Sequence, residues 1–238
     1  MKTVNFLFHF LIIWVVQYSY VFAYETEPAD YAIKNLQEIH SKFELIHGRV
    51  IDEYPEQLMV ATYLPPDAKV LELGGHAGRN SCVIATILND SRNLVTLESN
   101  QEFVTNMYEN RDHNRLQFHI EASALSKRPL IQSGWVSIPG EVVLPGYFRV
   151  HTITFDELQK KYNIEFDTLV ADCEGALYYV LLDDPDILRN IKLVIVENDY
   201  PNQDRLCYTT DLYKENGLEL VYSGSYGEAH NFYQVWKK

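Results

Sequence analysis

Hydrophobic and polar positions divide the chain into short apolar runs and longer segments with helical periodicity. The apolar runs lie at 69–73, 93–97, 116–120, 168–171 and 193–196 and are rich in Val, Ile and Leu. Runs of this kind are typical of strands that are buried on both faces, as the central strands of a parallel sheet are. Because helical segments alternate with them, we expect an α/β fold in which helices cover both faces of a mostly parallel sheet.

Helices are expected before and between these strands. Apolar residues recur at helical spacing within 27–50, so one or two helices should pack ahead of the sheet. Two further helices are predicted at 80–88 and 101–110. The segment 154–162 opens with the Thr-x-x-Glu spacing of a capping box, which predicts a helix that begins there.

Two closing strands are expected at 217–223 and 232–237, because the Gly- and Ser-rich turn between them suits an antiparallel pair. The predicted sheet then has seven strands, mostly parallel, and ends in an antiparallel strand. The apolar stretch 130–150 interrupts the pattern and predicts either a flap over a ligand site or an edge ribbon. No internal repeat or linker is visible in the sequence, so a single domain is expected over 24–238.

The N-terminal stretch is set apart from this fold. No charge occurs between Lys2 and Glu25, and residues 4–23 are mostly apolar. A positive start, an apolar run and a small residue at Ala23 predict a secretory signal peptide that is cleaved after Ala23. A membrane anchor is the rival interpretation, since the run just reaches the roughly 20 residues of a span, and a buried or interfacial helix is the third. If the leader functions, the protein enters the secretory pathway or associates with a membrane through residues 4–23; otherwise it is cytoplasmic.

Charge and cysteine content narrow the classes of partner and compartment. The chain has 33 Asp and Glu against 20 Lys and Arg, a formal net charge of −13. Such a surface repels a phosphate backbone, so nucleic acid is excluded as an expected partner. The three cysteines, Cys82, Cys173 and Cys207, do not form the framework of a disulfide-rich domain.

The turn after the first strand carries the first candidate site. Glu72 stands at the strand end, and Gly74, Gly75 and Gly78 lie where the backbone turns into a helix and a ligand can approach it closely. Glu98 ends the next strand, at a place where a carboxylate can accept both hydroxyls of a ribose. Together they predict an adenosine-containing cofactor. The alternatives are an ordinary tight turn and a solvated strand end.

Two features favour S-adenosylmethionine over a dinucleotide as this cofactor. The glycines do not follow the strict G-x-G-x-x-G spacing, and the second of the two closing strands can run antiparallel. S-adenosylmethionine has no pyrophosphate for a third glycine to approach. We therefore expect an S-adenosylmethionine site.

Several motifs in one order resemble those of a known family. They are Leu71–Gly78, Ala124–Ser126, Thr152–Leu158 and Asp172-Cys173-Glu174-Gly175 ahead of Val196-Glu197. Their order and spacing resemble the FkbM-type methyltransferases over roughly residues 66–200. The resemblance implies a class I, Rossmann-like methyltransferase fold and methyl transfer from S-adenosylmethionine to a hydroxyl, often on a sugar. The family usually has Gly-Ala-Asn-x-Gly at the first turn, where this chain has Gly75 and His76 in place of the Ala and Asn.

The resemblance also implies roles for individual residues. Residues at the first turn would hold the amino-acid end of the cofactor, the end of the second strand its ribose, and the segment after the third strand its adenine. In that order, the cofactor-binding residues expected are Glu72, Gly74, Gly75, His76 and Gly78, then Glu98 and Ser99, then Glu121, Ser123 and Ala124, with Asp172 beside them.

Catalytic candidates lie at the end of the fourth strand, where open α/β sheets bind ligands. Asp172 is expected to act as the general base or to align the acceptor hydroxyl, with Glu174 second and His76 as a further candidate. The alternative for Glu174 is to cap the following helix. Glu197 or Asp199 could join the two acids around a divalent cation. No metal is expected, however, because a solvated acidic rim explains the same residues.

The function predicted from the sequence is O-methylation of a hydroxyl on a sugar or glycan, with S-adenosylmethionine as the donor. Another small-molecule hydroxyl or a carboxyl is the alternative acceptor. A Rossmann-like binding module without catalysis is the alternative from another class, and it applies if the changed turn at Gly75 and His76 does not admit the cofactor. Oligomeric state has no signal in the sequence.

Overall fold

The computed structural model describes residues 30–200 and 202–238. The leader at 1–23, with its signal-peptide and anchor interpretations, lies outside these residues. Within the part of the chain that the structure describes, no helix has both the length and the apolar character that a membrane span requires.

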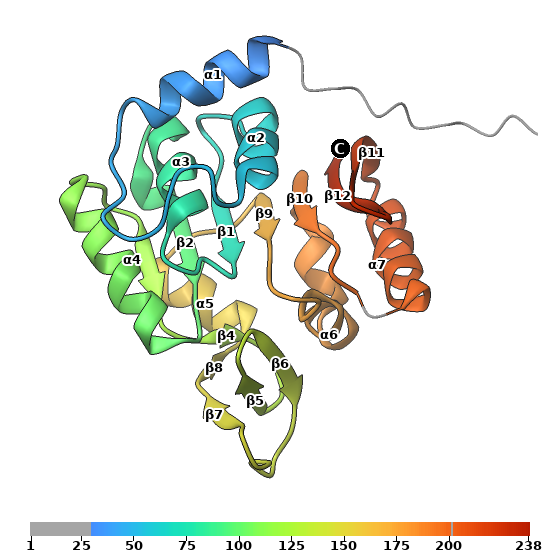
Figure 1. Cartoon of the computed structure of the whole chain (residues 1–238). Coiled ribbons are helices and arrows are strands. Elements are labelled where there is room, and N and C mark those ends of the chain that lie inside the picture. Colours follow the sequence, from blue (N-terminus) through green and yellow to red (C-terminus); the bar gives the residue numbers. More distant parts are fainter. Residues whose placement is uncertain (1–29, 201) are drawn as a thin grey trace, which may run out of the picture.

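A seven-stranded sheet forms the centre of the molecule (Figure 1). It consists of β1 (Val70–Leu73), β2 (Leu94–Leu97), β3 (His119–Glu121), β9 (Thr168–Ala171), β10 (Leu193–Glu197), β11 (Glu219–Tyr226) and β12 (Ala229–Lys237). The spatial order is β11-β12-β10-β9-β1-β2-β3. The strands from β3 to β10 in this order run parallel, while β12 lies between β10 and β11 and runs antiparallel to both. The expected fold class is therefore confirmed, including the antiparallel closing pair.

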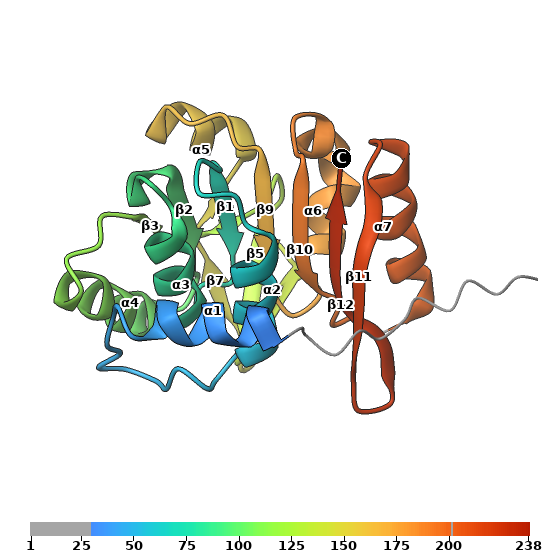
Figure 2. The same ribbon diagram turned by 90° about the horizontal axis from the view of Figure 1, so that it is seen from above.

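Helices cover both faces of this sheet (Figure 2). One face carries α1 (Asp30–His40), α2 (Tyr54–Tyr63), α3 (Arg79–Ile87) and α4 (Gln101–His113), and the other carries α5 (Phe155–Tyr162), α6 (Leu177–Asp183) and α7 (Gln203–Glu215). Successive strand residues point to opposite faces, so Val70 packs with the first group and Leu71 with the second. Each face of the sheet is thus covered by its own hydrophobic core, which explains why the central strands are continuous apolar runs.

The helices predicted at 80–88, 101–110 and 154–162 are confirmed as α3, α4 and α5. The capping box at the start of α5 is present. The Thr154 hydroxyl accepts the N–H of Glu157, and the Glu157 carboxylate accepts the N–H of Thr154. The sequence pattern therefore located this helix start correctly.

Of the one or two helices expected within 27–50, the structure forms one, α1, and the helix does not continue through 41–50. The backbone N–H groups of Glu44, Ile46 and His47 donate to the side chains of Asn114 and Asn110 on α4. An N–H that is engaged by a side chain is not available to the helical ladder. The helix that follows, α2, was not predicted, because residues 56–60 are all buried and show no amphipathic stripe.

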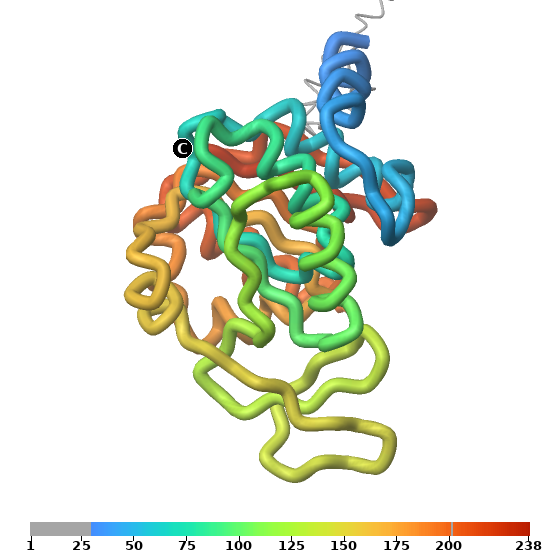
Figure 3. The backbone as a smooth tube through the Cα atoms, turned by 90° about the vertical axis from the view of Figure 1, so that its left-hand side faces the viewer, coloured from blue at the N-terminus to red at the C-terminus, as the bar shows by residue number. Residues whose placement is uncertain are grey.

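Two small sheets lie between β3 and α5. One pairs β4 (Ala124–Leu125) with β8 (Thr152–Ile153). The other, called the small sheet below, contains β5 (Leu130–Ser133), β6 (Val136–Pro139) and β7 (Phe148–Val150) in the antiparallel order β6-β5-β7. Figure 3 shows it as a lobe that projects beyond the main sheet. The stretch 130–150 is therefore a sheet of its own and not an edge ribbon of the main one.

Candidate active site

The carboxyl ends of the central parallel strands surround a cavity of about 280 Å³. Its walls include Gly74 after β1, Glu98 after β2, Ser123 after β3, Asp172 after β9, and Trp135 between β5 and β6. β1 and β9 are neighbours in space, yet the chain continues from β1 to β2 and β3 on one side before it reaches β9 on the other. Open α/β sheets bind ligands where the strand order reverses in this way. The cavity is therefore the candidate active site.

Two glycines allow the turn after β1 to pack closely against its neighbours. Gly74 has a φ of 87°, and a Cβ at this position would lie 1.7 Å from the carbonyl oxygen of Asp172. A Cβ on Gly75 would lie 2.3 Å from Thr96 Oγ1 and 2.7 Å from Met107 Cε. Alanine does not fit at either position without displacement of the backbone or the core. Thr96 and Met107 fill the space that an alanine side chain at position 75 would occupy.

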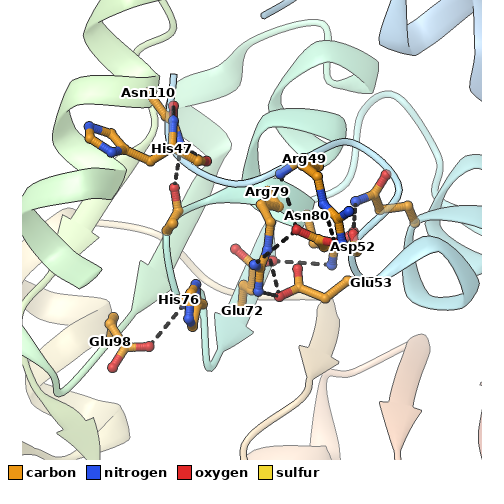
Figure 4. Close-up of polar contacts among 12 residues, drawn as sticks. His47, Arg49, Asp52, Glu53, Glu72, His76, Arg79, Asn80, Glu98 and Asn110 are labelled. Atoms are coloured by element: carbon orange, nitrogen blue, oxygen red, sulfur yellow. Dashed lines mark hydrogen bonds and ion pairs between the residues drawn. The ribbon is translucent and has the colours of Figure 1, made fainter. Parts of the chain in front are cut away.

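His76 stands at the tip of this turn in a left-handed conformation, with a φ of 46°. Its backbone N–H donates to Glu98 Oε2 over 2.9 Å (Figure 4). Its ring stacks on Phe103 at a centroid distance of 3.8 Å, and Trp135 stacks on both rings at 5.1 Å. Burial, with a contribution from Arg79, lowers the pKa of His76 to about 4, so the imidazole is neutral at pH 7. Its buried Nδ1 has no hydrogen-bond partner among the described residues.

Glu98 lies at the end of β2 and lines the cavity. It accepts backbone N–H groups from His76 over 2.9 Å and from Asn100 over 2.7 Å. Burial raises its pKa, and these backbone bonds oppose that rise. An ionised carboxylate has about four lone-pair positions, so the side chain retains capacity to accept ligand hydroxyls.

Glu72 lies behind the turn and does not form part of the cavity wall. It is 2% exposed and accepts hydrogen bonds from Ser81 Oγ over 2.5 Å and Asn80 Nδ2 over 3.2 Å. Burial raises the pKa of Glu72 to about 7, although these hydrogen bonds lower it in part. Gly75 and Gly78 also lie behind the wall, so direct cofactor contacts by these three residues stay predictions.

Arg79 connects the start of α3 to the segment that precedes α2. Its Nε donates to Glu53 Oε1 over 2.9 Å, and its Nη1 lies 3.7 Å from an oxygen of Asp52 (Figure 4). Its side chain is only 15% exposed. Glu53 also lines the cavity, which the sequence did not indicate, because it precedes the sheet and belongs to no motif.

Acidic side chains gather at the ends of β9 and β10. Burial raises the pKa of Asp172 well above its usual range, and neighbouring carboxylates add to the effect. A hydrogen bond with Asp199 raises the pKa of Glu174 to about 7, and burial raises that of Glu197 to about 11. Of these acids, Asp172 and Glu174 line the cavity. Acidic groups therefore dominate the cavity wall on this side.

Glu174 pairs with Asp199 rather than capping the next helix. The N-cap of α6 is Ala176, and no side chain caps that end. Glu174 itself has a φ of 53°, and Gly175 after it has a φ of 72°. A Cβ on Gly175 would lie 2.5 Å from the Asp199 carbonyl oxygen. The alternative of a helix-capping role for Glu174 is therefore not supported.

The predicted adenine segment lies partly in the cavity. Ser123 and Ala124 line it, and Ser99 does so from the end of β2. Glu121 instead accepts hydrogen bonds from α5, from Lys161 Nζ over 2.5 Å and from the Tyr162 hydroxyl over 2.9 Å. Its predicted contact with the adenine amine has no counterpart in this geometry and stays a prediction.

No sequence motif marks the aromatic part of the cavity wall. Phe103 and Tyr179 lie in helical segments, where an aromatic residue is usually core, and carried no motif. Trp135 lies in the apolar stretch 130–150, for which a flap over a ligand site was one of the two expectations. One sequence feature could have marked Trp135 as a site residue: it is an aromatic residue next to a glycine turn in a long insertion after the third strand.

Comparisons with known proteins bear on the general fold. No protein-family model and no curated protein matches the chain. Among solved structures, it is similar to a protein in the NADB-Rossmann superfamily from Streptococcus agalactiae, with 16% identity, a TM-score of 0.49, and coverage of 76% of this chain and 67% of that chain. It is also similar to an O-methyltransferase from Bacillus cereus in complex with SAH, with 14% identity, a TM-score of 0.47, and coverage of 88% and 91%.

A third similar structure is the fibrillarin of Aeropyrum pernix with bound S-adenosyl-L-methionine, with 11% identity, a TM-score of 0.44, and coverage of 77% of this chain and 73% of that chain. All of these identities and scores are low. The fold class is therefore assigned from the strand order of this chain. That order defines a Rossmann-like α/β protein with its ligand cavity where the strand order reverses.

Proposed function

We propose that the protein is an S-adenosylmethionine-dependent O-methyltransferase that acts on a hydroxyl of a sugar or glycan. The observation that carries the proposal is the cavity at the junction of β1 and β9. There the glycine turn after β1 and the carboxylate of Glu98 after β2 face one space. This arrangement suits a ligand with a ribose at one end and an amino-acid group at the other.

The charge of the cavity wall supports a cationic cofactor. Glu53, Glu98, Asp172 and Glu174 line it, and Arg79 is engaged with Glu53. Burial raises the pKa values of these carboxyl groups, and a sulfonium bound beside them would lower those values again and favour the ionised carboxylates, whereas phosphate groups would be repelled. A dinucleotide, which carries a pyrophosphate, is disfavoured on the same ground.

The turn after β1 supports the same choice. A pyrophosphate-binding turn uses glycine at the second and third positions of G-x-G-x-x-G, for close approach of the phosphates and for helix packing. Counted from Gly74, these positions hold His76 and Arg79. Both side chains are engaged, one in the aromatic stack and the other with Glu53, so the turn leaves little room for phosphates.

The finer assignment, to the FkbM-type methyltransferases, is part of the proposal. It is based on the motif that contains Asp172, Glu174 and Gly175. Gly175 lies so close to the Asp199 carbonyl that a larger residue would clash there, which explains the glycine at this position of the motif. The motif therefore joins the ends of β9 and β10 at the side of the cavity where an acceptor would enter.

In the proposed reaction, an acceptor hydroxyl oxygen attacks the methyl carbon, the carbon–sulfur bond breaks, and S-adenosylhomocysteine leaves. The hydroxyl proton leaves through a hydrogen bond to a carboxylate. Alignment of the two reactants supplies much of the rate.

We assign the hydrogen bond from the acceptor hydroxyl to Asp172, because it lines the cavity and its backbone is fixed against Gly74. Glu174 is the second candidate, and His76, with its neutral ring and unpartnered Nδ1 among the described residues, is the third.

The small sheet supports a sugar or glycan as the acceptor. Trp135 is 55% exposed and lines the cavity together with the polar side chains of Gln132 and Ser137. A flat aromatic face beside hydrogen-bonding groups suits a ring that has one apolar face and several hydroxyls. Acceptors with a different hydroxyl or with a carboxyl are the second candidates.

The leader belongs to the proposal as well. We propose that residues 1–23 direct the domain at 24–238 into the secretory pathway, with a membrane anchor as the alternative. Mass spectrometry of the protein after expression with its leader tests this. A mature chain that begins at Tyr24 is expected for cleavage, whereas an uncleaved chain in the membrane fraction would identify an anchor.

Transfer of labelled methyl groups from S-adenosylmethionine to a panel of free sugars, nucleotide sugars and glycans tests the proposed activity. We expect a labelled methyl ether on at least one of them. Asp172→Asn should lower turnover by about 100-fold or more, while the exposed variant Glu165→Gln should leave it unchanged. If label is found only on carboxyl groups, the acceptor is a carboxyl and not a hydroxyl. Cofactor binding without any methyl transfer would identify a binding module.

A further inference from the structure

Three carboxylates from separate elements meet beside the active-site cavity. Glu56 comes from α2, Asp172 follows β9 and Glu197 ends β10, and one oxygen of each lies within 4.8 Å of the others. Glu56 is 6% exposed, and its Oε2 has no hydrogen-bond partner among the residues that the structure describes. Like charges at this separation repel one another strongly away from water. The cluster therefore needs a compensating positive charge.

A small adjoining cavity has a second buried oxygen without a hydrogen-bond donor in its wall, among the described residues. The cavity measures about 10 Å³, and Glu56, Asp172 and Asn80 are among the residues that line it. Asn80 is 8% exposed; its Nδ2 donates to Glu72, whereas its Oδ1 has no partner within the described part of the chain. This volume is about that of one water-sized sphere. Buried oxygens without donors point to a ligand that the protein atoms alone do not supply.

The cationic side chain in this neighbourhood does not compensate the cluster. Arg79 pairs with Glu53 and lies near Asp52, as Figure 4 shows. Neutralisation must therefore come from bound protons or from a cation.

We propose that Glu56, Asp172 and Glu197 bind a divalent cation of the size of Ca²⁺. Carboxylate oxygens are the ligands that such hard cations prefer. Ca²⁺ bonds to oxygen at about 2.3–2.6 Å, so ligands on opposite sides of it stand about 5 Å apart. The corresponding separation across Mg²⁺ is about 4 Å. The three oxygens all lie within 4.8 Å of one another, which is inside this span for Ca²⁺, whereas Mg²⁺ also demands a near-octahedral shell that keeps several waters.

This position would give the cation a place at the acceptor side of the active site, because Asp172 belongs to both the cluster and the cavity wall. A cation there can bind and orient sugar hydroxyls. That role rests on the proposed function, whereas the binding of the cation does not.

Calorimetric titration of CaCl₂ into the metal-free full chain tests the proposal. We expect one saturable site per chain, with weaker binding of MgCl₂. Glu56→Gln and Glu197→Gln should each weaken Ca²⁺ binding by more than about tenfold, because loss even of an outer partner of a metal ligand has effects of that size. Glu165→Gln removes the same charge at an exposed site and should leave binding unchanged.

Thermal denaturation in chelator shows whether the variants are folded. Glu56→Gln removes one of three crowded carboxylates, so it should unfold at or above the wild-type temperature without metal and should lack the rise that Ca²⁺ gives the wild type. Absence of saturable wild-type binding, or equal binding by Glu56→Gln, would overturn the proposal and assign the compensation to shared protons. A parallel titration with S-adenosylhomocysteine keeps this outcome separate from failure of the proposed function.

Discussion

Asn110 shows how one side chain fixes the turn that forms the active site. It is wholly buried on α4; its Oδ1 accepts the N–H groups of Ile46 and His47, and its Nδ2 donates to the carbonyls of His47 and Ala77 (Figure 4). Ala77 belongs to the turn after β1. A single amide thereby connects the N-terminal segment, α4 and the wall of the cavity.

Asn110→Ala should lower the free energy of unfolding by about 2–4 kcal/mol, because four backbone groups in buried or half-buried hydrogen bonds lose their partner. Asn114, which caps the C-terminal end of α4, makes similar bonds to the backbone of Glu44 at the surface. Water can replace those bonds, so Asn114→Ala should cost less than about 1 kcal/mol. Urea denaturation of both variants measures the difference. An equal loss of unfolding free energy in the two variants would contradict the claim that burial makes the Asn110 hydrogen bonds more stabilising than those of Asn114.

Glu72 gives the stability of the protein a specific pH dependence. The folded chain keeps a proton on this carboxyl up to its pKa of about 7, whereas its ordinary value is 4.5. Between these values the folded state binds more protons than the unfolded state, so this residue makes stability fall as pH rises. The full contribution across the window is about 3 kcal/mol.

The Glu72→Gln variant should therefore lose this part of the pH dependence. Its unfolding free energy, relative to that of the wild type, is expected to rise between pH 4.5 and 7 and to level off above pH 7. Denaturation at several pH values measures it, with Glu165→Gln as the exposed control. A constant difference between Glu72→Gln and wild type across that range would show that Glu72 titrates normally in the folded state.

At the scale of elements, the small sheet connects to the active site at two points. The Ser99 hydroxyl after β2 donates to Gln132 Oε1 on β5 over 2.7 Å. Trp135, in the turn between β5 and β6, stacks with His76 and Phe103. The small sheet thus closes the cavity over the turn that follows β1.

Trp135 should consequently report cofactor binding through its fluorescence. It is half exposed at the cavity, whereas Trp236 is buried in the core at 3% exposure. Titration with S-adenosylhomocysteine should change the emission of the wild type and leave that of Trp135→Phe nearly unchanged. A change that persists in Trp135→Phe would place the ligand away from the small sheet.

At the scale of the whole molecule, the sheet was predictable because its strands carry their own signal. Burial on both faces makes 168–171 and 193–196 continuous apolar runs, and the structure places β9 and β10 there. The site at the strand ends followed from parallel pairing, which brings Gly74, Glu98 and Asp172 to one edge. These inferences needed only local pattern and the geometry of parallel sheets.

Other parts of the site depend on contacts that no local pattern encodes. Glu56 reaches Asp172 because α2 packs against β10, far away in sequence. Glu121 has the expected place after β3, but Lys161 and Tyr162 of α5 bind its carboxylate. Such pairings arise from tertiary packing, so positions along the strands were predictable from the sequence, whereas the direction of every side chain was not.

Calorimetric titration of the full chain with S-adenosylhomocysteine, and separately with NAD⁺, tests the central claim most directly. The glycine turn after β1 and the carboxylate of Glu98 predict one equivalent of S-adenosylhomocysteine bound at micromolar affinity, a binding free energy of about −8 kcal/mol. NAD⁺ should give no saturable heat. Absence of S-adenosylhomocysteine binding at millimolar concentration by the folded chain, or tighter binding of NAD⁺, would contradict the account.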